Sequence, residues 1–249
     1  MTPHANAVLI TGASRGIGAA TAVAAARNGF DVAINYVADE EAAQRVVDAV
    51  LPYGRKAVAV QGDVAIAADV QRIFSLTEKE LGPLAGLVNN AGVTGPIGPF
   101  SQTTDATIER VFAVNVFGTM QCARAALASF ERHKHAGIIV NISSIAAQTG
   151  SPNEYIHYAA SKAAVEAFTL GLAREVAGSG IRVCAVAPGS TLTDIHATAG
   201  EPGRPARIAG KIPMGRLAEP NEIAETIVWL LSPAASYITG RVVHCSGGL

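Results

Sequence analysis

Short apolar runs alternate along this chain with longer segments in which apolar residues recur at helical spacing. That alternation is typical of a parallel β-sheet covered by helices on both faces, because such strands are buried on both sides and each crossover carries a helix. It predicts strands at residues 7–10, 31–36, 57–61, 84–89, 137–142, 182–187 and 242–245.

The segments between these strands predict six helices. Right-handed crossovers place all of the elements in one open, doubly wound parallel sheet, an α/β fold of the Rossmann type with about seven strands. No linker or change of composition divides residues 1–249, so we expect a single domain with one irregular segment at residues 190–216. The predicted helices are residues 16–28, 40–51, 67–81, 105–132, 158–177 and 219–231.

The composition excludes several classes of protein. Apolar residues make up 49% of the chain and charged residues 16%, so a large core is easily built and a disordered chain is excluded. The charges are scattered, with a formal net charge of −1 and no basic stripe, so no nucleic-acid partner is expected. No uninterrupted apolar run approaches the ~18 residues that span a bilayer, so no membrane partner is expected either.

The three cysteines, Cys122, Cys184 and Cys245, lie far apart in the sequence. They have neither disulfide nor metal-ligand spacing, so no bound metal is expected. An odd number of unpaired cysteines and the lack of a leader-like N-terminus predict a cytoplasmic protein.

A glycine-rich turn follows the first predicted strand and opens the first predicted helix. Glycines allow a tight turn and a close backbone approach to a pyrophosphate, and the helix N-terminus points N–H groups at that anion. A glycine pattern alone is weak evidence, but a strand before it and a helix after it predict a nucleotide site. The turn consists of Gly12, Ala13, Ser14, Arg15, Gly16, Ile17 and Gly18.

Tyr158 and Lys162 lie four residues apart, on one face of a predicted helix. An isolated pair at this spacing is usually an unremarkable surface feature. Here it indicates a catalytic site, because the chain also has the nucleotide turn and, after the strand at 137–142, Ser143 and Ser144. Hydride transfer to a carbonyl builds charge on its oxygen, so a proton donor is needed there. Useful acid–base work near neutrality requires the pKa of a tyrosine to fall by roughly three units, about 4 kcal/mol. We expect the Lys162 ammonium and the positive ring of the oxidised cofactor to supply that shift.

Further motifs make the sequence resemble the short-chain dehydrogenase/reductase family over essentially its full length. The resemblance is to the branch of 3-oxoacyl-acyl carrier protein reductases and glucose dehydrogenases. In that family the motifs contact the adenine, line the cofactor cleft, carry the catalysis and hold the nicotinamide carboxamide and phosphates. They are Asp63-Val64, Asn89-Asn90-Ala91-Gly92, Tyr158 with Lys162, and Pro188-Gly189 with Thr193.

The resemblance implies roles for four catalytic residues. Tyr158 is the acid in reduction and the base in oxidation, and Lys162 also holds the nicotinamide ribose. Ser144, the second serine of the pair, hydrogen-bonds the carbonyl oxygen. The gap from Ser144 to Tyr158 is one residue longer than the commonest family spacing, which leaves Ser143 as the alternative. Asn115 holds a water in the proton relay.

The expected cofactor is NADP(H) in preference to NAD(H). NAD-binding members of the family usually end the second strand with an acidic residue, whereas Tyr36 stands there in this chain. Arg15 can pair with a 2′-phosphate through its guanidinium fork. The glycine turn and the resemblance together predict cofactor contacts from Gly12, Ser14, Arg15, Gly16, Ile17, Gly18, Tyr36, Asp63, Val64, Asn90, Ala91, Gly92, Tyr158, Lys162, Pro188, Gly189, Thr191 and Thr193.

These residues predict an oxidoreductase that transfers hydride between the nicotinamide and a small-molecule carbonyl or secondary alcohol. A 3-oxoacyl thioester, a sugar and a simple ketone all remain possible substrates, and the resemblance implies a homotetramer. The alternative is a catalytically silent nucleotide sensor, which would not need the proton donor. His157 points about 100° around the helix from Tyr158, so we expect it in the substrate pocket or at the surface.

Overall fold

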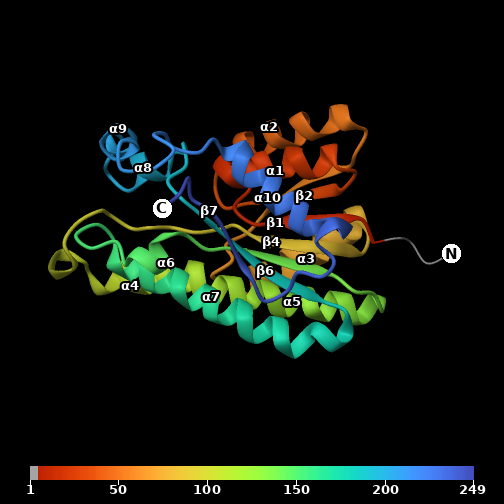
Figure 1. The fold of residues 1–249 in the computed structure, drawn as a ribbon. Coiled ribbons are helices and arrows are strands. Elements are labelled where there is room, and N and C mark those ends of the chain that lie inside the picture. The colour runs from red at the N-terminus through yellow and green to blue at the C-terminus, as the bar shows by residue number, and fades with distance from the viewer. Residues whose placement is uncertain (1–4) are drawn as a thin grey trace.

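Seven parallel strands form the central sheet of the computed structural model, which describes residues 5–249. The strand order is β3-β2-β1-β4-β5-β6-β7, and the sheet lies between two layers of helices (Figure 1). The strands are β1 (Ala7–Ile10), β2 (Asp31–Tyr36), β3 (Ala57–Gln61), β4 (Leu84–Asn89), β5 (Ile138–Ile142), β6 (Arg182–Pro188) and β7 (Val242–Cys245). The predicted fold class is confirmed.

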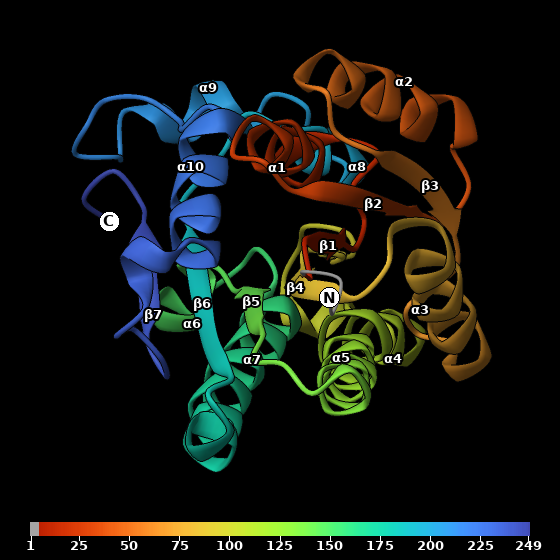
Figure 2. The same cartoon turned by 90° about the vertical axis from the view of Figure 1, so that its right-hand side faces the viewer.

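Helices cover both faces of the sheet (Figure 2). One face carries α1 (Gly16–Arg27), α2 (Glu40–Val50) and α10 (Pro220–Leu231). The other face carries α3 (Ala67–Leu81), α4 (Asp105–Phe112), α5 (Thr119–His133) and α7 (Ile156–Val176). Shorter helices are α6 (Ala146–Thr149), α8 (Ile195–Thr198) and α9 (Arg204–Ala209), with 3-10 turns at Leu51–Tyr53, Phe100–Gln102, Ala177–Ser179 and Pro233–Ala235.

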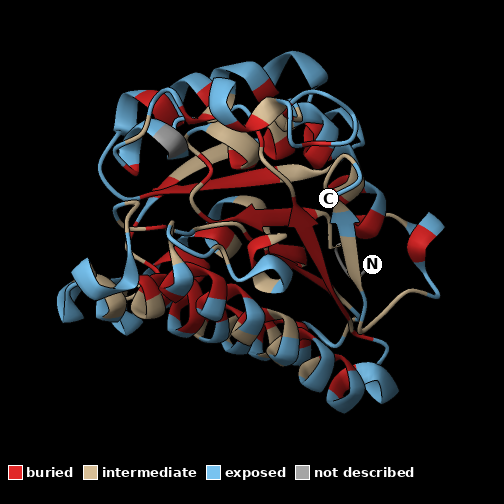
Figure 3. Ribbon diagram, turned by 60° about the vertical axis from the view of Figure 1, so that its left-hand side comes forward, coloured by how far each residue is buried: buried red, intermediate tan, exposed pale blue. Residues whose placement is uncertain are grey.

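The two layers have separate cores, because successive side chains of a strand point to opposite faces. In β1, Val8 and Ile10 pack toward α1 and α10, whereas Ala7 and Leu9 pack toward α3 and α5. All four are fully buried, which explains why the strand is a continuous apolar run. Figure 3 shows the same arrangement, with buried strands inside helices whose outer faces are exposed.

The strand order reverses direction next to β1. From β1 the chain builds the sheet outward through β2 and β3, then returns to place β4 on the other side of β1. A crevice opens at such a switch point, beyond the carboxyl ends of the strands, and it is the usual place for a ligand in this kind of sheet.

Several segments differ from the sequence-based expectation. Residues 190–216 were expected to be irregular, but they contain α8 and α9. The helix predicted at 105–132 is one helical stretch that changes hydrogen-bonding pattern, with a π-helical segment at Ala113–Gly118 between α4 and α5. Helix α7 begins at Ile156, two residues before the predicted start.

One helical stretch of the described residues, Asp105–His133, is long and apolar enough to cross a membrane by length and composition. The mean hydropathy of a window thus identifies one candidate membrane span, whereas the search for uninterrupted apolar runs identified none. Half of its most apolar window is buried inside the protein, and α5 packs against β4 and α3. A core helix of a soluble protein passes the same test, so this is weak evidence for a membrane span.

Candidate active site

A cleft of about 1090 Å³ lies at the carboxyl ends of the strands and continues beneath α8 and α9. All of the predicted site residues line this cleft except Gly18 and Asn115, which lie just behind its wall. The residues that line it are Gly12, Ser14, Arg15, Gly16, Ile17, Tyr36, Asp63, Val64, Asn90, Ala91, Gly92, Ser144, Tyr158, Lys162, Pro188, Gly189, Thr191 and Thr193.

The glycine turn connects β1 to α1 at one end of the cleft. Gly12 and Gly16 have φ of 59° and 56°, a left-handed conformation that favours glycine. A Cβ at Gly18 would lie 2.6 Å from Nδ2 of Asn90, so no side chain fits there. No side chain caps the start of α1, and its first turn carries no acidic residue. These features fit a pyrophosphate, which the N–H groups at this helix end would bind.

Buried side chains fix the shape of the turn. Asn90 donates from Nδ2 to the carbonyl oxygens of Thr11 and Gly12, each at 2.9 Å. Asn35, the penultimate residue of β2, accepts from the N–H of Gly12 at 3.2 Å and donates to the carbonyl of Gly62 at 2.9 Å. Sequence reasoning missed Asn35. Its signal was an amide in an otherwise apolar strand, which needs partners once it is buried.

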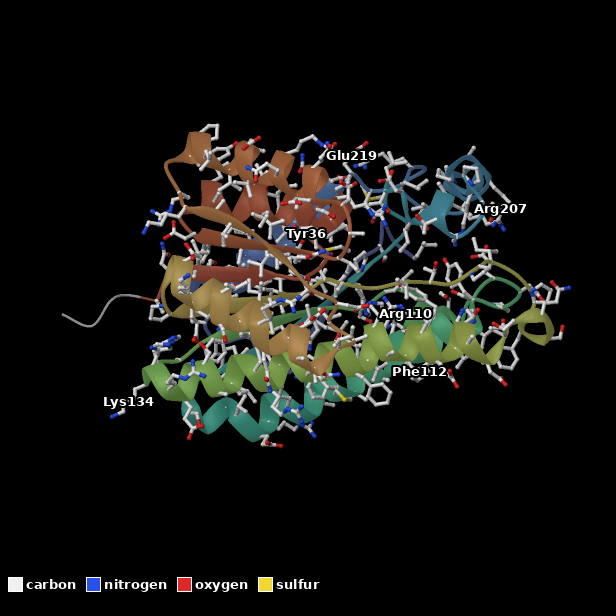
Figure 4. The ribbon with its side chains drawn as sticks, turned by 180° about the vertical axis from the view of Figure 1, so that it is seen from behind. Tyr36, Arg110, Phe112, Lys134, Arg207 and Glu219 are labelled. Carbon is white, nitrogen blue, oxygen red and sulfur yellow. The ribbon has the colours of Figure 1, made fainter. Side chains whose placement is uncertain are left out.

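The end of β2 forms part of the cleft wall. Tyr36 is the last residue of that strand and is 7% exposed (Figure 4). Arg15 is exposed in the glycine turn and also lines the cleft. Asp39 lines the cleft as well, but its carboxylate caps α2 by accepting from the N–H of Ala42 at 2.8 Å.

Asp63 is already engaged by protein groups. One carboxylate oxygen accepts from the N–H of Ala65, and the other forms an ion pair with Arg110, each at 2.9 Å. Arg110 lies on α4 on the other side of the cleft from β2 (Figure 4). Val64 packs against Gly118, where an added Cβ would lie 2.7 Å from Val64 Cγ2. The pair Asp63-Val64 therefore also connects the chain after β3 with α4 and with the π-helical segment at Ala113–Gly118.

Tyr158 and Lys162 lie on one face of α7 and are both almost fully buried, at 8% and 4% exposure. The ammonium of Lys162 donates to the carbonyl oxygen of Ile142 at 2.7 Å and lies 5.6 Å from the centre of the Tyr158 ring. Burial disfavours the charged form of a lysine and lowers the pKa of Lys162 to about 8.

The protein's own groups do not produce the expected fall in the pKa of Tyr158. Burial is the largest influence and raises the pKa of Tyr158 above its ordinary value, because the phenolate loses its hydration. A hydrogen bond with Ser144 and the charge of Arg204 oppose this rise but do not overcome it. The structure thus holds Tyr158 as a neutral phenol.

The structure distinguishes the two candidate serines. Ser144 lines the cleft, hydrogen-bonds Tyr158 and accepts from the N–H of Ala146 at 3.1 Å. Ser143 is buried and donates to the carboxylate of Glu166 on α7 at 2.7 Å. Ser144 is therefore the serine whose hydroxyl lies beside the phenol.

Asn115 lies in the π-helical segment and is completely buried. Its amide accepts from the N–H of Val93 and donates to the carbonyl of the same residue, each at 2.9 Å. It also donates to the hydroxyl of Ser161 at 3.0 Å. Asn115 thus joins the end of β4 to α7, next to Lys162.

His157 is buried, contrary to the expected position in the substrate pocket or at the surface. Its Nε2 donates to the carbonyl oxygen of Thr94 at 2.8 Å. Because Tyr158 faces the cleft, the neighbouring position on the helix faces the loop that follows β4. His157 therefore ties that loop to α7.

Comparisons with known proteins show which family this chain belongs to. The family model described as enoyl-(acyl carrier protein) reductase matches residues 12–249. An uncharacterised oxidoreductase of Escherichia coli K12 is 44% identical over 96% of this chain and 98% of its own length. A 3-oxoacyl-[acyl-carrier-protein] reductase of Staphylococcus aureus is 35% identical over 97% of this chain and 96% of its own.

A solved structure shows the same fold. The 3-ketoacyl-(acyl-carrier-protein) reductase from Brucella melitensis, complexed with NADH, superimposes with a TM-score of 0.90 at 32% identity. The match covers 98% of this chain and 97% of that protein. The chain belongs to the short-chain dehydrogenase/reductase family, as its motifs predicted. It is an oxidoreductase that uses a nicotinamide cofactor and transfers hydride to or from a carbonyl or alcohol group of a small molecule.

Proposed function

We propose that this protein is an NADP(H)-dependent carbonyl reductase in which Tyr158 is the general acid and base. The observation that carries the proposal is the placement of the Tyr158 hydroxyl beside Ser144, in the wall of a cleft that also contains the glycine turn. The same site would oxidise a secondary alcohol, because the reverse reaction uses the same groups in the opposite protonation states.

Each of the four catalytic side chains has a separate role in reduction. When bound, the nicotinamide supplies the hydride. Ser144 donates a hydrogen bond to the substrate carbonyl and orients it. Tyr158, held as a neutral phenol by burial, gives its proton to the oxygen as negative charge develops there. Lys162, with a pKa of about 8, can return a proton near neutral pH, and Asn115 fixes the backbone beside it.

We also propose a set of further contacts with the cofactor. The residues that make them are Asp63, Val64, Asn90, Ala91, Gly92, Pro188, Gly189, Thr191 and Thr193. Gly92 leaves room for Lys162, because an added Cβ would lie 3.3 Å from its Nζ. Gly16 and Thr193 approach each other, with 3.2 Å from an added Cβ to Cγ2 of Thr193. We infer that Thr191 and Thr193 close the cofactor site from the side opposite Asn90.

A panel assay with a matched variant tests this proposal. NADPH oxidation is followed at 340 nm with acetoacetyl-CoA, cyclohexanone, D-glucose and L-rhamnose, the sugars being assayed as alcohols with NADP⁺. We expect turnover on at least one compound, no turnover for Tyr158→Phe, and an unchanged NADPH dissociation constant. Tyr53→Phe, an exposed tyrosine outside the cleft, is the control. NADPH binding without turnover on any compound would instead support the nucleotide-sensor alternative.

The preference for NADP(H) depends on Arg15. The charge on a 2′-phosphate pairs with an exposed guanidinium, and Tyr36 brings no carboxylate to repel it. Arg15→Ala should weaken NADPH about tenfold or more while changing NADH binding little, as measured by fluorescence titration. Arg45→Ala, an exposed arginine outside the cleft lining, is the control. Equal losses for the two cofactors would contradict the preference.

We also propose that the protein works in the cytoplasm as a homotetramer. Cys122 and Cys184 are buried and Cys245 is partly exposed, and all three are free thiols. Free thiols are the usual state in a reducing compartment. Exposed apolar side chains on the α5 and α7 layer support a contact between subunits.

A further inference from the structure

A buried cation links the segment at residues 190–216 to the residues directly before α7. Arg204, the first residue of α9, is 7% exposed. Its guanidinium lies 5.3 Å above the ring of Tyr155 and forms an ion pair with Glu154 at 2.6 Å. Glu154 and Tyr155 come directly before α7. Arg204 therefore connects α9 with the start of the helix that carries Tyr158.

Further contacts hold the same segment in place. Arg207, one turn further along α9, pairs with Glu154 at 2.9 Å and with Glu201 at 2.6 Å, and it is exposed at the outer side of α9 (Figure 4). The N–H of Ile97 donates to the carbonyl of Ala199 at 3.1 Å. Burial alone would raise the pKa of Glu154, but hydrogen bonds from the two arginines outweigh it and hold that pKa below its usual range.

The ring of Tyr155 contacts both Arg204 and Tyr158. It meets the ring of Tyr158 edge to face, with 5.2 Å between the centres. Arg204 thus lies over one ring, and that ring packs on the phenol that transfers the proton. Aromatic pairs prefer this edge-to-face arrangement, so the ring of Tyr155 helps to fix the orientation of the Tyr158 ring.

We propose that Arg204 is a positioning residue that couples the seating of residues 190–216 to proton transfer by Tyr158. When the segment is seated over the cleft, Arg204 orients Tyr158 through Tyr155 and brings a positive charge toward the phenol. When the segment lifts, both effects are lost. Full catalytic competence is thereby restricted to the closed cleft. This inference rests on the proposed role of Tyr158.

The charges around Tyr158 give the direction of the effect. Lys162 faces it from α7, Ser144 from the end of β5, Tyr155 from the loop before α7 and Arg204 from α9, where Glu154 partly offsets the cation. A cation favours the phenolate, and Arg204 lowers the pKa of Tyr158 against the larger effect of burial. Removing the charge of Arg204 should therefore raise the pH needed to form the base in alcohol oxidation.

The test compares Arg204→Gln, Arg204→Lys and Arg207→Gln in the full-length protein. The kcat for alcohol oxidation with NADP⁺ is measured from pH 6 to 10, using the fastest alcohol of the panel. In the plot of kcat against pH, we expect Arg204→Gln to shift the acidic limb to higher pH by about half a pH unit to one pH unit. This corresponds to about a threefold to tenfold loss of kcat at pH values below that limb. Arg204→Lys should keep most of the wild-type profile. Arg207→Gln, which also removes a partner of Glu154, should raise KM and shift the limb less than Arg204→Gln, because Arg204 keeps its own contacts with Glu154 and Tyr155.

A limb that stays at the wild-type pH in Arg204→Gln would overturn the proposal, even if KM or stability changed. A limb shifted equally by Arg207→Gln would also overturn it, because the effect would then belong to Glu154 rather than to the charge over Tyr155. If Arg204→Gln unfolds, Arg204→Lys and Arg204→Met decide, since the first keeps the charge and the second keeps most of the packing. Lack of turnover by the wild-type protein would contradict the proposed function itself, and is thus a separate outcome.

Discussion

At the scale of the residue, burial acts on Tyr158 and Lys162 in opposite directions. It raises the pKa of the phenol and lowers that of the ammonium, so both groups are pushed toward their neutral forms. A neutral phenol is the form that donates a proton to a carbonyl, and an amine with a pKa of about 8 exchanges protons near neutrality. The protein's own groups therefore favour the protonation states that suit reduction.

The lowered pKa of Lys162 predicts how stability depends on pH. The pKa is about 8 in the folded protein against 10.5 for an exposed lysine, so the unfolded chain binds the proton more readily. The resulting destabilisation is full below pH 8 and disappears as the pH rises above 10.5. Relative to Lys162→Met, the free energy of unfolding of the wild type should rise by about 2 kcal/mol between pH 7 and 9.5. Urea unfolding at both values measures this, and a flat or falling difference would show that Lys162 keeps its ordinary pKa.

Some site residues were predictable from the sequence and others were not. Ser144, Tyr158 and Lys162 were found because their chemistry depends on residue type and on spacing along the chain. Tyr155 and Arg204 were not placed at the site beforehand, because their contact joins segments about fifty residues apart. The direction of the pKa shift of Tyr158 was also missed, since desolvation depends on the packing of every neighbouring segment.

At the scale of the element, the turn between β1 and α1 depends on close packing against the end of β4. A methyl group at Gly18 would lie 2.6 Å from Asn90 Nδ2 and 2.8 Å from the Cα of Ala13. Gly18→Ala should therefore destabilise the protein by about 1–3 kcal/mol and weaken NADPH by about tenfold. Thermal unfolding and cofactor titration measure the two effects.

Gly171→Ala is the matched control for this substitution. It lies inside α7 with nothing within 4 Å of an added Cβ, so the better helix propensity of alanine should stabilise the protein by up to about 1 kcal/mol. If both glycines tolerated alanine equally well, close packing would not explain Gly18.

The elements themselves were largely predictable, because buried parallel strands and amphipathic helices have clear periods. Several elements were missed, for two physical reasons. Helices α8 and α9 have only 4 and 6 residues, which is too short to show a helical period. The π-helical segment at Ala113–Gly118 differs from an α-helix in hydrogen bonding rather than in apolar pattern, so no sequence period reveals it.

At the scale of the whole molecule, large apolar side chains remain exposed on the layer that contains α5 and α7. Phe117 is 58% exposed, Leu170 40% and Met120 37%. Phe117→Glu should dissociate the proposed tetramer, because a charge would be buried in the contact without a partner. Size-exclusion chromatography with light scattering measures the mass. Leu51→Glu, which is equally exposed but lies after α2, should leave it unchanged. A wild-type protein that is monomeric would contradict the assembly.

The proposed mechanism requires Tyr158 to face the reacting carbon. A crystal structure of the protein with NADP⁺ and an oxidisable alcohol tests this directly. We predict that the Tyr158 hydroxyl lies within hydrogen-bond distance of the alcohol oxygen, on the side of the nicotinamide C4 that faces the substrate, with Ser144 on the same oxygen. A complex in which that hydroxyl points away from the C4 face, with the alcohol bound to other residues, would contradict the proposed mechanism.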